Sequence, residues 1–138
     1  MRAEAQAHVD QIRSALDLLR RFLDWDRALR RLDELNNRVE DPSLWNDAKA
    51  AQEVMRERRR LDEAIGATRA IGAELDDTIE LIELAEAEGD EAMVDDAVAS
   101  LAALASRAER EAATAPVRQA AVRREEDSDF LQREGGIY

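Results

Sequence analysis

Cysteine is absent from this 138-residue chain, and histidine occurs once, at His8. The first absence excludes disulfides, thiol nucleophiles and cysteine-ligated metals, and the second excludes metal sites built from several histidines. A nucleophilic triad needs a base, usually histidine, and His8 stands alone near the N-terminus. We therefore expect no enzymatic activity, no bound metal and no cofactor.

Proline and glycine are scarce, at two and five residues, and aromatic side chains make up only 4% of the chain. The longest stretch without a charged residue, 97–106, is too short to span a bilayer. The first residues lack the apolar core of a signal peptide. These absences predict a cytoplasmic protein that makes no contact with membranes.

Charge is abundant but unbalanced, with 20 basic and 32 acidic residues and a net charge of −12. This excess of acid argues against a protein that coats nucleic acid, and we expect no direct sequence-specific binding to it. The length suits one domain, and the Ala, Glu, Arg and Leu content is typical of long helices and coiled coils.

Apolar residues before Pro42 recur at helical spacing and form two neighbouring stripes. The first stripe comprises Val9, Ile12, Leu16, Leu19 and Leu23, and the second comprises Leu18, Phe22, Trp25, Leu29, Leu32 and Val39. The buried face therefore rotates within 18–25. We expect a break at Asp24, whose carboxylate could cap a second helix.

A turn is expected at 40–47, and Asn46 or Asp47 can cap the helix after it. A heptad repeat then predicts one long helix from about Asp47 to about Glu88. Gly89 is expected to end this helix and Asp90 to begin the next, which runs to about Ala113. The short connection makes the two helices antiparallel. The fold expected is an all-α antiparallel bundle built on a long coiled-coil-like hairpin. A helical domain is expected at 1–115 and a weakly structured or disordered tail at 116–138. The expected core comprises Phe22, Trp25, Leu29, Leu32, Leu44, Trp45, Leu61, Ile65, Leu75, Ile79, Ile82, Leu101 and Leu104.

Acidic and basic residues are segregated along the chain. No Lys or Arg occurs in 70–106, which holds 11 acidic residues on both sides of the expected hairpin tip. The candidate acidic contact for a basic protein surface comprises Glu83, Glu86, Glu88, Asp90 and Glu91. The candidate basic contact comprises Arg56, Arg58, Arg59 and Arg60. Charge runs of this kind are more often solvated helix surfaces than binding sites, and this is the alternative for both groups.

Several landmarks together resemble the N-terminal helical domain of bacterial peptide chain release factor 2, a class I release factor. They are Phe22-Leu23-Asp24-Trp25-Asp26, Arg31-Leu32-Asp33-Glu34-Leu35, Asp41-Pro42-Ser43-Leu44-Trp45-Asn46-Asp47, Leu81-Ile82-Glu83-Leu84-Ala85 and Glu88-Gly89-Asp90-Glu91. The likeness covers about 10–112. It implies a helical domain that precedes the catalytic core of a translation termination protein and lies on the ribosome near the GTPase-associated region of the large subunit. It also implies interplay with release factor 3.

The family's catalytic and codon-reading elements are not found in this sequence. Gly135-Gly136 is followed by Ile137, where the catalytic loop has Gln, and the Ser-Pro-Phe element that reads stop codons does not occur. We expect an accessory ribosome-associated domain that cannot release peptide by itself. The alternatives are a self-associating coiled-coil adaptor and a truncated or frameshifted remnant. A third interpretation, the helical arm of a transfer-RNA synthetase, predicts a basic arm, and the acidic tip argues against it.

Overall fold

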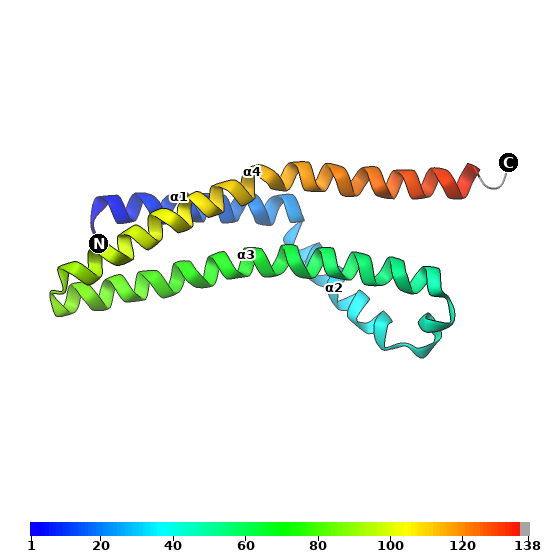
Figure 1. Cartoon of the computed structure of the whole chain (residues 1–138), viewed down its shortest axis with the longest axis horizontal. Helices are drawn as coiled ribbons and strands as arrows, with labels where there is room; N and C mark the ends of the chain where they lie inside the picture. The colour runs from blue at the N-terminus through cyan, green and yellow to red at the C-terminus, as the bar shows by residue number, and fades with distance from the viewer. Residues whose placement is uncertain (136–138) are drawn as a thin grey trace.

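A computed structural model describes residues 1–135 of the chain, and the side chains of residues 1–118. Its helices are α1 (Ala3–Leu23), α2 (Trp25–Glu40), the short 3-10 helix η1 (Pro42–Asn46), α3 (Ala48–Glu88) and α4 (Glu91–Gly135). No strand occurs within residues 1–135, so the predicted all-α class is confirmed. Helices α3 and α4 form a long antiparallel hairpin, with α1 beside α4 and α2 beside the first half of α3 (Figure 1).

The predicted break between the first two helices is confirmed at Asp24. This residue has a left-handed backbone with φ of 52°, and its N–H donates to the carbonyls of Arg20 and Arg21, which ends α1. Its side chain makes no capping hydrogen bond, so the expected role of the carboxylate as the cap of α2 is wrong. Trp25 follows at once, half-buried, with the guanidinium carbons of Arg20 and Arg69 at 6.0 and 5.7 Å from its ring centre.

The ends of the long hairpin follow from local side-chain chemistry. The Asp47 carboxylate accepts a hydrogen bond from the Ala50 N–H at 3.1 Å, which caps α3. Gly89 takes a left-handed φ of 68°, which glycine adopts without steric cost, and closes the C-terminus of α3. The Asp90 carboxylate then accepts from the Met93 N–H at 3.0 Å and caps α4. The roles of Gly89 and Asp90 were predicted from the sequence, and Asp47 was one of the two residues predicted to cap α3.

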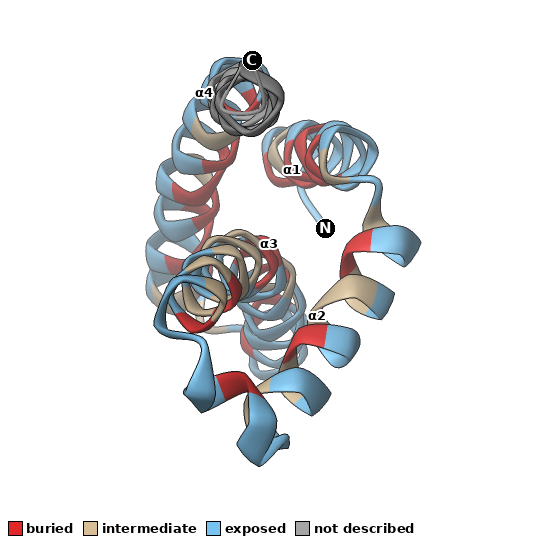
Figure 2. Ribbon diagram, turned by 90° about the vertical axis from the view of Figure 1, so that its right-hand side faces the viewer, coloured by how far each residue is buried: buried red, intermediate tan, exposed pale blue. Residues whose placement is uncertain are grey.

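Two separate hydrophobic cores share α3, and the buried residues lie mostly on the sides of the helices that face one another (Figure 2). The hairpin core joins α1, the second half of α3 and α4, and includes Ile12, Leu16, Leu75, Ile82 and Leu101. The arm core joins α2, η1 and the first half of α3, and consists of Leu35, Leu44, Ala51 and Val54. Many hairpin-core residues on α4 are alanines, which let the helices approach closely.

The expected core is confirmed at six positions, half-buried at five and wrong at two. The buried six are Leu44, Ile65, Leu75, Ile82, Leu101 and Leu104, and the half-buried five are Trp25, Leu29, Leu32, Leu61 and Ile79. Trp45 is 56% exposed because it lies in η1, where heptad spacing does not determine which side chains are buried. Phe22 is 38% exposed because it continues the stripe of α2 but lies on α1, whose buried face is formed by Leu16 and Leu19.

Helix α4 runs through Pro116 to Gly135 instead of ending near Ala113. Proline lacks an N–H, so Pro116 cannot make the helical bond to the carbonyl of Ala112, yet the helix continues. The Pro116 side chain is exposed and displaces nothing in the hairpin core. The side chains of the expected tail lie largely outside the described residues, and the division at residue 115 stays a prediction.

Candidate functional site

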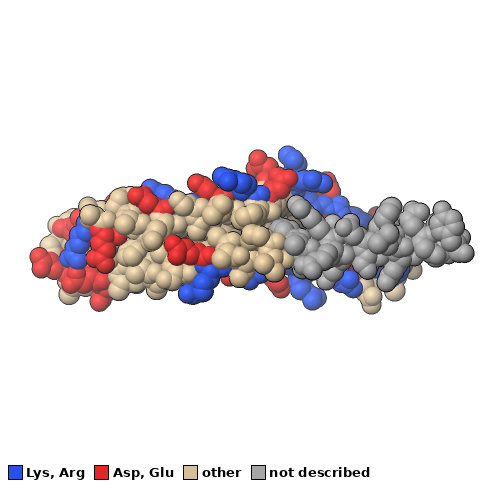
Figure 3. Space-filling model, turned by 90° about the horizontal axis from the view of Figure 1, so that it is seen from above, with Lys and Arg blue, Asp and Glu red and all other residues tan. Residues whose placement is uncertain are grey.

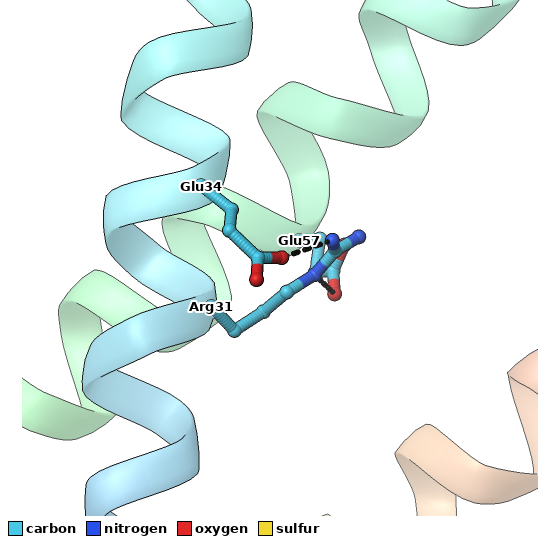
Figure 4. Close-up of polar contacts among 3 residues, drawn as sticks. All are labelled: Arg31, Glu34 and Glu57. Carbon is cyan, nitrogen blue, oxygen red and sulfur yellow. Dashed lines mark hydrogen bonds and ion pairs between the residues drawn. The ribbon is translucent and has the colours of Figure 1, made fainter.

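The contact between α2 and α3 is held by a charged cluster around Arg31. Its guanidinium donates to both carboxylate oxygens of Glu57 at 2.8 Å and to Glu34 at 3.0 Å (Figure 4). These bonds raise the pKa of Arg31 and lower the pKa of the half-buried Glu57, because each stabilises the charged form of its partner. Both groups therefore stay charged at neutral pH and fix α2 against α3.

The four predicted basic contact residues separate into two pairs with different surroundings. The Arg58 Nε–H donates to the Asn36 side-chain oxygen at 2.6 Å, and Arg60 is also engaged in an interaction, so both are occupied within the fold. Arg56 and Arg59 are exposed, and neither has a hydrogen-bond or ion-pair partner in the described part of the chain. Only this second pair is available to bind another molecule.

Arg56 and Arg59 form one side of a shallow groove of about 470 Å³. The groove, called here the Trp45 groove, is lined by Trp45, Ala51, Gln52, Met55, Arg56 and Arg59. η1 supplies the tryptophan, and successive turns of α3 supply the other side chains. Apolar and cationic atoms therefore meet on one open surface.

The turn that carries Trp45 is held by its own hydrogen bonds. The Asp41 carboxylate accepts from the Ser43 N–H at 3.0 Å and from the Ser43 hydroxyl at 2.9 Å, which lowers the pKa of Asp41. The Trp45 indole N–H donates to the Val39 carbonyl at 3.2 Å, and the neighbouring Leu44 is buried in the arm core. The indole ring is thus exposed and held in position by its neighbours.

The predicted acidic contact lies at the opposite end of α3 from the Trp45 groove, where α3 turns into α4. Acidic side chains gather at this end of the molecule (Figure 3). Glu83, Glu88 and Glu91 are exposed, whereas Glu86 lies 3.3 Å from the amino group of Met1 and Asp90 caps α4. Three of the five residues are therefore available to a partner, and two also serve the fold.

Sequence reasoning found the arginines of the Trp45 groove but missed the groove itself. Gln52 and Met55 were not singled out, and Trp45 was assigned to the core. The only local signal for an exposed Trp45 is Pro42, three residues before it. Pro42 starts a turn, so the burial of Trp45 cannot be predicted from helical spacing.

Two kinds of site are missing from the described residues. Within residues 1–118 no three acidic or histidine side chains are grouped so that they could hold a metal ion. None of the helices, over the described range, is both long and apolar enough to cross a membrane.

Comparison with known proteins assigns the family. The model of the PCRF domain matches residues 28–129, most of the chain, and therefore includes most of α2, all of η1 and α3, and much of α4. The chain belongs to the PCRF domain family.

Relatives of the chain include proteins named peptide chain release factor 2, which confirms the resemblance predicted from the aromatic and proline landmarks. The protein of Paramagnetospirillum magneticum is 56% identical over 108 residues, which is 78% of this chain and 29% of that protein. The protein of Ruegeria sp. strain TM1040 is 47% identical over 108 residues, with the same coverage. The chain thus spans less than a third of the length of these relatives.

Proposed function

We propose that this chain acts as an accessory, ribosome-associated domain of a release factor 2-like termination protein and does not release peptide by itself. Support comes from its similarity to proteins named peptide chain release factor 2, of which it spans only 29%. It also comes from the lack of a Gly-Gly-Gln tripeptide in the sequence. The large-subunit GTPase-associated region and release factor 3 are the partners proposed.

The acidic tip of the hairpin is the contact we propose for the ribosome. The last turn of α3 carries no basic residue, although a cation there would interact favourably with the negative end of the helix dipole. Glu86 and Glu88 instead add negative charge to that end, at some expense of helix stability. A negative tip of this kind is suited to a basic protein surface.

Co-sedimentation with 70S ribosomes over a salt series, with a peptide-release assay on stop-codon complexes, tests the proposal. We expect saturable binding that weakens with salt, and no peptide release by this chain alone. Failure to bind at low salt would refute ribosome association. Peptide release by the purified chain would refute the accessory role.

Paired variants test the contact itself. Glu83→Gln with Glu88→Gln removes two exposed charges from the tip, and Asp26→Asn with Asp33→Asn removes two exposed charges from α2. Both pairs change the net charge equally, so only the tip pair should weaken binding to the ribosome. Equal weakening by both pairs would show that net charge, and not the tip, matters.

The self-associating adaptor remains the second candidate. The exposed Leu81 and Leu84, at 41% and 54%, lie on one side of α3 near the tip and are the apolar surface it would use. Light scattering over a concentration series separates the two, because the adaptor predicts a concentration-dependent oligomer and the accessory domain does not.

A further inference from the structure

The Trp45 groove combines an exposed aromatic ring that is held in position with a methionine and two arginines. A large aromatic side chain is 56% exposed yet held by the bond from its indole N–H to the Val39 carbonyl. Because the ring is already positioned, little conformational entropy is lost when a ligand packs on it. Tryptophan, methionine and arginine are also the residue types enriched where proteins bind one another.

The charge of the groove is not neutralised by the fold. Arg31 and Arg58 are bound to Glu57 and Asn36, whereas Arg56 and Arg59 have no hydrogen-bond or ion-pair partner among the residues described. These two lie three positions apart and so on the same side of α3. Each can donate to a carboxylate in a charge-assisted hydrogen bond.

We propose that the Trp45 groove binds a short acidic segment of another protein. One apolar side chain of that segment packs on Trp45 and Met55, and flanking carboxylates pair with Arg56 and Arg59. Charge complementarity selects this partner over a nucleic acid, because a chain of net charge −12 repels a dense polyanion, while a few carboxylates fit two arginines. The groove lies at the end of α3 away from the acidic tip, so it is a surface separate from the contact proposed for the ribosome.

Fluorescence anisotropy with a labelled peptide, Gly-Asp-Glu-Leu-Phe-Glu-Asp-Gly, tests the proposal on the full chain at low salt. Three comparison probes are the same peptide with amides for carboxylates, the same peptide with Ala-Ala for Leu-Phe, and oligouridine. We expect saturable binding of the first peptide alone. Its affinity should fall with added salt, because the arginines are exposed.

Variants locate the binding. Trp45→Ala and the double change Arg56→Ala with Arg59→Ala should each weaken binding by about tenfold or more. The double change Arg27→Ala with Arg30→Ala removes two exposed arginines at the same spacing on α2, and Leu84→Ala removes an exposed apolar side chain at the tip. Neither of these controls should alter binding.

Trp45→Phe keeps an aromatic ring and should retain most of the affinity, and circular dichroism of each variant reports whether it is folded. Absence of saturable peptide binding would overturn the proposal. So would binding that survives in folded Trp45→Ala, or oligouridine binding through the same residues in place of the peptide. Each of these results leaves ribosome binding through the tip unaffected.

Discussion

Arg31 and Glu57 are 26 positions apart in the sequence, and their side chains meet through two hydrogen bonds of 2.8 Å each (Figure 4). The pair joins α2 to α3 beside the arm core, which contains only four buried residues. With so small a core, an ordered pair of charges contributes noticeably to how firmly α2 is held.

Arg31→Ala should lower the free energy of unfolding by about 1 kcal/mol, the upper part of the range for exposed ion pairs, because both oxygens of Glu57 are engaged. Urea denaturation measures the change. Arg30→Ala, on the neighbouring exposed residue, is the control and should have little effect. A double-mutant cycle with Glu57→Gln should give a coupling of the same size, and zero coupling would show that the pair does not stabilise the fold.

Acid should weaken this contact. The pKa of Glu57 in the folded chain lies below its ordinary value of 4.5. The ionised carboxylate therefore makes its full contribution to the stability of the fold above pH 4.5. This contribution is lost as the pH falls through the lower pKa that Glu57 has in the folded chain. The difference in unfolding free energy between the natural chain and Glu57→Gln should therefore be constant from neutral pH to about 5 and shrink below 4.5. A difference independent of pH down to 2 would contradict the assignment.

Truncation of Leu35 should destabilise the chain far more than truncation of Trp45. Leu35 is fully buried in the arm core, and Leu35→Ala should cost about 2–5 kcal/mol. Trp45 is 56% exposed, so Trp45→Ala should cost about 1 kcal/mol, chiefly the bond to the Val39 carbonyl. Thermal melting of both variants shows which substitution destabilises the chain more. A larger loss of stability for Trp45→Ala would show that the tryptophan is part of the core.

The same substitution should act in opposite directions at Gly66, inside α3, and at Gly89, which follows the last residue of α3. A methyl group added at Gly66 or Gly89 meets no atom within 4 Å, so backbone conformation alone decides the sign. Gly66 lies inside the helix, and Gly66→Ala should stabilise by about 1 kcal/mol. Gly89 has a φ of 68°, and Gly89→Ala should destabilise by about 1–2 kcal/mol. Equal signs in urea denaturation would contradict the described backbone.

The features predicted correctly from the sequence are those that neighbouring residues determine. Asp47, Gly89 and Asp90 act within a few residues of their own position, so their roles follow from side-chain chemistry alone. The expected end of the last helix near Ala113 was wrong, because Pro116 weakens the helix there without ending it.

The Trp45 groove and the Arg31 cluster could not be predicted in the same way. Arg56, Arg58 and Arg59 look alike in the sequence, and only the packing of α2 on α3 shows that Arg58 is bound to Asn36. The exposure of Trp45 depends on the path of η1, which helical periodicity does not describe. Contacts between residues far apart in the sequence therefore follow from the fold and cannot be predicted from local sequence patterns.

The division of the buried side chains into two cores also governs how the molecule opens. Helix α1 belongs to the hairpin core and α2 to the arm core, and the left-handed Asp24 is the one residue between them. We therefore expect α2 and η1 to separate from α3 as a cooperative unit while the hairpin stays intact. Amide hydrogens of α2 should exchange with deuterium sooner than those of α1, even though both helices are fully formed.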